Sequence, residues 1–218
     1  MGALRVVVTT DNQYRIGATA LVAFASLYAL TNSLNLGTPV ELSPLWIEDN
    51  LPLLPATVWV YASFLPLSVA AFVLEKDCVQ LTRFVYSQSA VNLLSTAFFV
   101  LLPTTFVRPE LAGPDSVSLD ALRLIWFLDA PVNCLPSLHV SSILVSVLML
   151  WSSRHRAWPF FALWALAVTL STMTTKQHHI ADVLAGALIA VCAYWIFFVQ
   201  ASYQARPQPA QAPVTANH

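Results

Sequence analysis

Six long intervals of this sequence contain no Asp, Glu, Lys or Arg, and each is about 20 residues or longer. A helix of about 20 apolar residues is long enough to cross the hydrocarbon core of a bilayer. The intervals cover residues 16–40, 50–74, 84–107, 130–153, 157–175 and 183–205. They predict an all-α fold, a polytopic membrane helix bundle with about six transmembrane helices.

A buried helix of a large soluble protein can be equally apolar, so the composition has to decide between the two classes. Only 10% of the 218 residues are charged, against about 25% in an ordinary soluble domain. Six such helices would leave too little polar surface to cover them. We therefore expect one membrane domain over residues 1–205, followed at 206–218 by a proline-containing tail that is too polar to order itself.

Basic residues mark alternate ends of the predicted spans. They are Arg5, Arg15, Lys76, Arg83, Arg154, Arg156 and Arg206. The positive-inside rule places these segments and both termini in the cytoplasm, and the loops after Val40, Val107 and Thr175 outside. Two stretches of the outer loops, 42–46 and 119–128, are predicted as short interfacial helices, with simple loop packing as the alternative.

The remaining composition limits the partners. A net charge of −1, without a basic stripe, gives no indication of nucleic acid as a partner, and the lipid bilayer is the expected environment. Cys78, Cys134 and Cys192 lie on separate segments without metal-like or redox-like spacing. We predict no disulfide and no metal held by cysteine, and we find no signal for an oligomeric state.

Polar residues are costly at membrane depth, so the places that concentrate them are candidates for function. In the segment 133–139, Pro136 is predicted in the first turn of the fourth span, with His139 close behind it at the outer surface. Free backbone N–H groups around Ser137 and the helix dipole make this turn suitable for a phosphate. A purely structural histidine is the alternative.

The segment 171–182 ends the fifth span and begins the sixth on the same outer side. His178 and Asp182 are four residues apart, which predicts that they share one helical face. A carboxylate that accepts the Nδ1 proton of an imidazole leaves the other nitrogen free to attack an electrophile. A metal site that includes His179 is the alternative, but adjacent histidines point in different directions, and we predict no metal.

Arg108 lies at the outer end of the third predicted span, level with His139 and His178. An arginine at the end of a membrane span often only extends its guanidinium to the membrane–water interface. A guanidinium beside two histidines also matches the geometry of a phosphate.

Pro136-Ser137-x-His139, followed by Ser171-x6-His178-x3-Asp182, resembles the second and third signature motifs of the type-2 phosphatidic acid phosphatase superfamily. Within it, residues 134–139 and 175–186 look most similar to the branch containing inositol phosphorylceramide synthases. The likeness covers roughly residues 104–186.

The first motif of that superfamily, Lys-x6-Arg-Pro, is where this sequence departs. Lys76 and Arg83 have the right separation, but Phe84 replaces the proline. The predicted orientation also places this pair about 30 Å from the histidines, on the cytoplasmic face. Arg108 precedes a proline on the outer side, with Leu101 at the lysine position.

The third motif has Thr172 where many members have arginine, and Lys176 is a candidate for supplying the missing charge. The resemblance implies that Arg108, Lys176 and Ser137 bind the phosphate oxygens. It also implies that His178 attacks phosphorus, and that Asp182 orients it.

In the same scheme His139 protonates the departing alcohol and later activates the acceptor. The resemblance thus implies a lipid-phosphate phosphatase without a cofactor, working through a phosphohistidine at the non-cytoplasmic face. One alternative is a head-group phosphotransferase, in which a lipid alcohol replaces water. Another is a non-catalytic lipid-binding protein. A transporter is disfavoured because no span is interrupted near the midplane.

Overall fold

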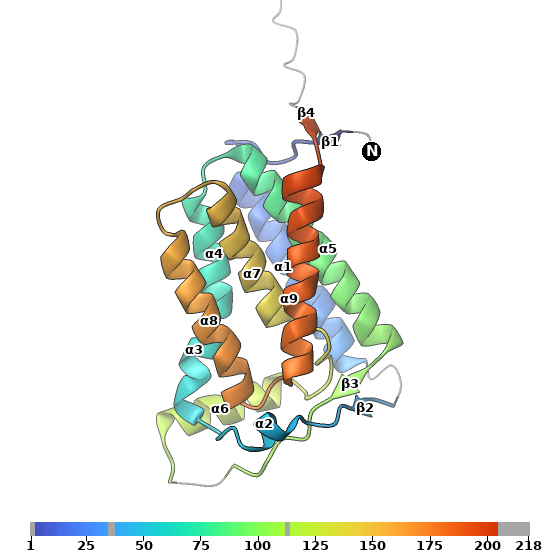
Figure 1. Cartoon of the computed structure of the whole chain (residues 1–218), viewed down its shortest axis with the longest axis vertical. Coiled ribbons are helices and arrows are strands. Elements are labelled where there is room, and N and C mark those ends of the chain that lie inside the picture. The colour runs from blue at the N-terminus through green and yellow to red at the C-terminus, as the bar shows by residue number, and fades with distance from the viewer. Residues whose placement is uncertain (1–2, 35–37, 112–113, 205–218) are drawn as a thin grey trace, which may run out of the picture.

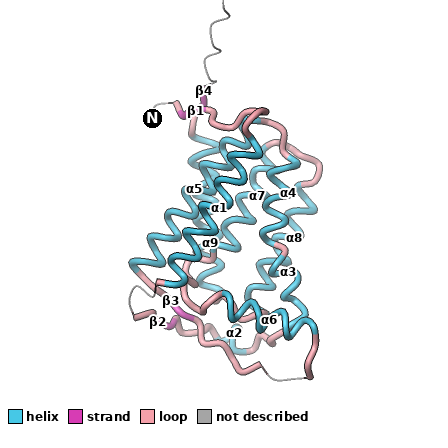
Figure 2. Tube along the Cα trace, turned by 180° about the vertical axis from the view of Figure 1, so that it is seen from behind, coloured by secondary structure: helices cyan, strands magenta, loops and turns pink. Residues whose placement is uncertain are grey.

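The chain forms a bundle of roughly parallel and antiparallel helices, which confirms the all-α prediction (Figures 1 and 2). The computed structural model describes residues 3–34, 38–111 and 114–204, so the tail predicted at 206–218 lies outside the described residues. One end of the bundle carries short loops and the first and last strands. The other end carries the longer loops and the short helices.

The helices that form the bundle are α1 (Gln13–Ser33), α4 (Phe64–Leu74), α5 (Cys78–Leu101), α7 (Leu138–Ser152), α8 (Trp158–Thr174) and α9 (Ile180–Tyr194), and α9 continues into the π-helical η2 (Trp195–Gln200). The other helical elements are α2 (Trp46–Asp49), η1 (Pro55–Thr57), α3 (Val58–Ala62) and α6 (Val117–Leu128). Strand β1 (Leu4–Arg5) pairs with β4 (Tyr203–Gln204), and β2 (Val40–Glu41) pairs with β3 (Thr104–Thr105), both in parallel.

Each predicted apolar interval overlaps one helix or one continuous helical stretch. Four stretches are long and apolar enough to cross a membrane: Gln13–Ser33, Pro55–Leu74, Cys78–Leu101 and Ile180–Gln200. Helices α7 and α8 are also apolar but shorter. The chain has the features of a membrane protein, and the count of six spans stays a prediction.

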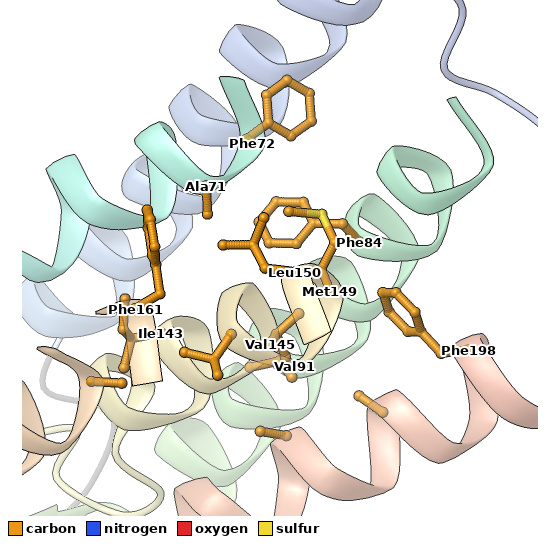
Figure 3. Close-up of a cluster of buried hydrophobic side chains, with 14 of the residues drawn as sticks. Ala71, Phe72, Phe84, Val91, Ile143, Val145, Met149, Leu150, Phe161 and Phe198 are labelled. Carbon is orange, nitrogen blue, oxygen red and sulfur yellow. The ribbon is translucent and has the colours of Figure 1, made fainter. Parts of the chain in front are cut away.

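Helix α7 lies at the centre of the bundle and packs against α9, α8, α5 and α4. Its side chains Ile143, Val145, Met149 and Leu150 are in the buried cluster of Figure 3. The outside of the bundle is apolar, as at Leu163, which is 69% exposed. Several small polar residues are instead buried between helices: Ser87, Ser95, Ser141 and Ser146. This distribution suits a lipid environment, where small residues let helices approach closely.

Side-chain caps set where several helices begin. Helix α5 starts before its charge-free interval because the Asp77 carboxylate accepts N–H bonds from Val79 and Gln80 at 2.7 and 3.2 Å. Ser137 is the N-cap of α7, accepting from the Val140 N–H at 3.4 Å. Pro136 therefore precedes the helix, and its prediction in the first turn is wrong.

The two interfacial helices have different outcomes. Helix α6 confirms that residues 119–128 are helical, and their position at a membrane interface stays a prediction. The helix expected at 42–46 is wrong, because α2 begins only at Trp46, where the Glu48 carboxylate accepts the Leu45 N–H and closes the first turn.

The Lys76–Arg83 segment lies far from the histidine motifs. The Arg83 guanidinium lies over the rings of Phe198 and Tyr203, 6.0 and 5.2 Å from their centroids, beyond the C-terminal end of α9. The histidine motif lies at the N-terminal end of α9, at the opposite end of the bundle (Figure 1). This arrangement agrees with the prediction that Lys76 and Arg83 do not share the histidines' substrate.

Candidate active site

His178 and Asp182 face each other where the chain enters α9. His178 Nδ1 lies 3.4 Å from Asp182 Oδ2. The prediction that both residues share a helical face is wrong, because α9 begins at Ile180 and His179 is its N-cap. The contact forms because Asp182 reaches back over the first turn, where the same Oδ2 accepts the His179 N–H at 2.8 Å. One carboxylate thus caps the helix and faces the histidine.

His139 meets His178 from the first turn of α7, as the sequence predicted for that turn. His139 Nδ1 lies 3.3 Å from His178 Nε2. The ring of His139 is held between Tyr61 and Phe64, with centroid distances of 4.6 and 4.3 Å. Only 8% of His139 and 6% of His178 is exposed, so both imidazoles sit in a largely enclosed site.

The nearest partners of the ring nitrogens favour one arrangement of protons. Asp182 Oδ2 is the acceptor nearest to His178 Nδ1, although no hydrogen bond joins this nitrogen to the described residues, so a His178 with its proton on Nδ1 would have its lone pair on Nε2. His139 Nδ1 could then donate to His178 Nε2. The pair holds an unprotonated nitrogen beside a protonated one, which a nucleophile and a general acid require.

Ser137 and Gly186 join the two histidine segments. The Ser137 N–H donates to Asp182 O at 2.9 Å, so it is not one of the free donors predicted at this turn. The Ser137 hydroxyl is the cap of α7. A Cβ atom at Gly186 would lie 2.4 Å from Ser137 O, so only glycine permits this approach of α9 to α7. The role of Ser137 in binding phosphate stays a prediction.

Arg108 lies beside the segment that carries His178, in the loop after β3 and not at the end of a helix. Its guanidinium donates to Trp126 O at 2.9 Å, Asp129 O at 2.8 Å and Gln177 Oε1 at 2.6 Å. Burial lowers the pKa of Arg108, while the nearby Asp129 charge opposes that shift. Gln177 immediately precedes His178, so these bonds hold a positive charge next to the segment that carries His178.

Asp129 is a carboxylate of this site that the sequence analysis did not select. It accepts from Tyr28 Oη at 2.6 Å, Asn32 Nδ2 at 3.1 Å and Tyr61 Oη at 3.5 Å. Burial raises its pKa, and the Tyr28 hydrogen bond and the charges of His178 and Arg108 only partly offset this. Its partners lie 68 to 101 residues away in sequence. One sequence feature could have identified Asp129: it is an acidic residue directly before the charge-free interval 130–153.

Helix α2 and the residues after it hold the loop between α8 and α9 through Lys176 and Glu48. Lys176 Nζ donates to Leu51 O at 2.7 Å and to Glu48 O at 3.3 Å. The buried Glu48 carboxylate accepts the Ile180 N–H and lies 3.4 Å from His179 Nδ1. The Lys176 ammonium is thus bound by backbone carbonyls, and its contact with a phosphate stays a prediction. The sequence analysis did not select Glu48 because it lies 132 residues before Ile180, its partner at the start of α9, and belongs to neither histidine motif.

The two neighbouring histidines face different carboxylates, His178 towards Asp182 and His179 towards Glu48. Within residues 3–34, 38–111 and 114–204, no group of three or more His, Cys, Asp or Glu side chains is arranged to hold a metal ion. A cavity of about 280 Å³ adjoins both histidines. Lys176 and the acidic residues Glu41, Glu48 and Asp49 also line it.

Comparison with known proteins identifies the superfamily of the chain. No curated protein and no solved structure gives a significant match to the chain. A sequence model of the PAP2 superfamily matches residues 25–196, which include both histidine segments and Arg108. The narrower likeness to inositol phosphorylceramide synthases stays a prediction. The extent of this match, over most of the chain, means that the protein belongs to the PAP2 superfamily.

Proposed function

We propose that this protein is a lipid-phosphate phosphatase that works through a phosphohistidine on His178. The observation that carries the proposal is the continuous line of contacts from Asp182 to His178 to His139, at 3.4 and 3.3 Å. A carboxylate, a nucleophilic imidazole and a second imidazole in this order suit covalent phosphoryl transfer. Membership of the PAP2 superfamily supports phosphatase or phosphotransferase chemistry.

In the first step, the lone pair of His178 Nε2 attacks phosphorus and the ester P–O bond breaks. With the phosphate bound, His139 acts as the imidazolium. Its Nδ1 proton passes to the departing alkoxide, which leaves as a neutral lipid alcohol, and His139 becomes a neutral imidazole. Asp182 stabilises the positive charge that develops on the His178 ring. The lipid alcohol and a phosphohistidine are then present.

In the second step, water attacks phosphorus and the N–P bond to His178 breaks. His139, now unprotonated at Nδ1, takes a proton from that water. Inorganic phosphate leaves, His178 is again a neutral imidazole, and His139 is again the imidazolium that began the cycle. The two steps together consume one water per ester bond and use no metal.

Charge on the phosphate oxygens would be met chiefly by Arg108. Its Nε has no hydrogen-bond partner among the described residues, so one donor of the guanidinium is uncommitted. The positive N-terminal end of α7 adds to this field. We include Lys176 and Ser137 as weaker candidates because the ammonium and the hydroxyl each have protein partners.

We further propose that the site faces the non-cytoplasmic side of a multi-pass protein. The basic segments at Arg5, Lys76 and Arg154 belong to the end of the bundle opposite the histidines, as the positive-inside rule requires. A substrate phosphate would then approach from the outer leaflet.

A lipid head-group phosphotransferase is the second candidate. The observation that favours it is the enclosure of both His139 and His178, each less than 10% exposed. An enclosed site can favour a lipid hydroxyl over water as the acceptor. The same residues would act, with the lipid alcohol replacing water in the second step.

The test uses detergent-purified wild type, His178→Ala and His155→Ala, with dipalmitoyl phosphatidate, with and without ceramide as acceptor, and with and without a chelator. His155 is a matched control because it lies in the loop between α7 and α8, at the other end of the bundle. Free phosphate and new lipid species are measured in parallel.

We expect chelator-resistant phosphate release in wild type and His155→Ala and none in His178→Ala. A new phospholipid without phosphate release would identify the transferase. Turnover that survives in His178→Ala would overturn the mechanism. Absence of turnover in all three proteins would favour the non-catalytic alternative.

A further inference from the structure

A long apolar cavity of about 450 Å³ runs along α1 between this helix and α4, with α5 and α7 behind it. Tyr14 lines one end of it and Tyr28 the other. These residues are 14 positions apart on α1, which corresponds to about 21 Å at the rise of an α-helix. The cavity is therefore long and narrow and extends through much of the bundle.

The outer end of this cavity reaches the candidate active site. Phe64 lines the cavity, and its ring centroid lies 4.3 Å from that of His139. Tyr28 also lines it and donates to Asp129 at 2.6 Å. A single ring thus separates the cavity from the catalytic imidazole.

Exposed residues of α1 and α4 border the side of the cavity that faces away from the centre of the bundle. Leu21 on α1 and Leu65 and Val69 on α4 line it, and they are 37%, 41% and 40% exposed. In a membrane these side chains face lipid tails. The hydrocarbon chain of a lipid can therefore pass from the bilayer into the cavity between α1 and α4 without crossing water.

We infer that this cavity binds one hydrocarbon chain of the lipid phosphate substrate and that its depth sets the longest chain accepted without rearrangement. The inference rests on the proposed function. Leaving the bilayer for this cavity brings no hydrophobic gain, because lipid tails are as apolar as its walls. Its effect on the substrate is therefore steric, through alignment of the phosphate with His139 and His178 and through chain length.

Two positions on α1 divide the cavity by depth. Ala25 lies three residues before Tyr28, about 5 Å from the outer end, whereas Ala18 lies ten residues before it, about 15 Å away. Both line the cavity. An octanoyl chain is too short to reach Ala18, and a palmitoyl chain passes it.

The experiment measures kcat/KM for dioctanoyl and dipalmitoyl phosphatidate in wild type, Ala18→Phe, Ala25→Phe and Ala23→Phe. Ala23 is the matched control because it is an exposed alanine of α1 that does not line the cavity. We expect Ala18→Phe to lower kcat/KM about tenfold or more for the palmitoyl substrate alone. Ala25→Phe should lower it for both substrates, and Ala23→Phe for neither.

Thermal unfolding in detergent shows whether each variant is folded. If folded Ala18→Phe affects both substrates equally, or neither, the assignment of the cavity is wrong while the proposed function stands. If His178→Ala still hydrolyses dioctanoyl phosphatidate, the proposed function fails instead. Absence of hydrolysis of both substrates by the wild type would overturn both.

Discussion

His139 Nδ1 lies 3.3 Å from His178 Nε2, although the two residues are 39 positions apart and His139 belongs to α7 while His178 lies in the loop between α8 and α9. Their contact depends on Ser137 and Gly186, which bring α7 and the start of α9 together. In the proposed mechanism the phosphoryl group enters between these two nitrogens. Variants around this pair therefore separate chemistry from positioning.

Asp182→Asn should abolish most activity with little loss of stability. The amide oxygen can still accept the His179 N–H and cap α9, but it cannot stabilise a positive imidazole at His178. We expect kcat to fall on the order of 100-fold or more. Single-turnover phosphate release and thermal unfolding, measured on the same preparation, check this. A variant with full kcat would show that the carboxylate acts only as a cap.

Arg108→Lys should raise KM and lower kcat. Lysine keeps the charge, but an ammonium cannot reproduce the planar set of donors that reaches Trp126, Asp129 and Gln177. We expect a loss in kcat/KM of about tenfold or more, in line with removal of a charge-assisted hydrogen bond.

The matched control for that variant is Arg123→Lys, since Arg123 is an exposed arginine of α6 that pairs with Asp115 and Asp120. Steady-state kinetics gives kcat/KM for both variants relative to wild type. Equal effects of the two substitutions would mean that Arg108 is not part of the phosphate site.

Glu48→Gln tests whether α2 positions the segment that carries His178. The carboxylate accepts the Ile180 N–H and faces His179 Nδ1, so the neutral amide weakens both interactions. We expect kcat to fall about tenfold with KM nearly unchanged, because the substrate contacts remain while the nucleophile is less well oriented. Asp49→Asn is the control, as this exposed neighbour lines the same cavity. A change in KM alone would contradict a positioning role.

Gly186→Ala should destabilise the bundle. The added methyl group would lie 2.4 Å from the backbone oxygen of Ser137, so α7 and α9 must separate. Overpacking of this kind costs about 1–3 kcal/mol. At Gly17 the added Cβ would meet only the Phe72 side chain, at 2.7 Å, and that ring can turn. Thermal unfolding should thus show a larger loss for Gly186→Ala than for Gly17→Ala, and the reverse order would contradict the assigned contact.

Asp129→Asn should change the pH dependence of stability. Burial raises the pKa of Asp129, so the folded chain holds this proton more tightly than the unfolded chain. The stabilisation from this proton is complete below the unfolded pKa of about 3.9, and it is lost as pH rises through that value towards the raised folded pKa. The asparagine side chain does not titrate in this range, so the stability of Asp129→Asn lacks this pH-dependent contribution.

The difference in melting temperature, the Asp129→Asn variant minus wild type, should therefore become more positive as pH rises through that window and then level off. Thermal unfolding in detergent across a series of acidic buffers measures it. A difference that becomes more negative over the same range would contradict a raised pKa.

Local sequence patterns predicted the helices well but placed several boundaries wrongly. The charge-free intervals each coincide with a helical stretch, because long apolar segments satisfy their backbone groups internally in a membrane. The boundaries at Pro136 and Ile180 differ because single side chains, Ser137 and Asp182, cap the helices. Caps depend on the conformation of one residue, which periodicity does not report.

The sequence alone predicted the membrane class and the helical fold, and its motifs predicted that His139, His178 and Asp182 act together. Only the tertiary structure revealed the contribution of Asp129 and Glu48. Asp129 meets Tyr28 from 101 residues away, and Glu48 meets Ile180 from 132 residues away. Composition and motif spacing describe local preferences. Contacts over such separations depend on how the helices and outer loops pack together, which no local pattern encodes.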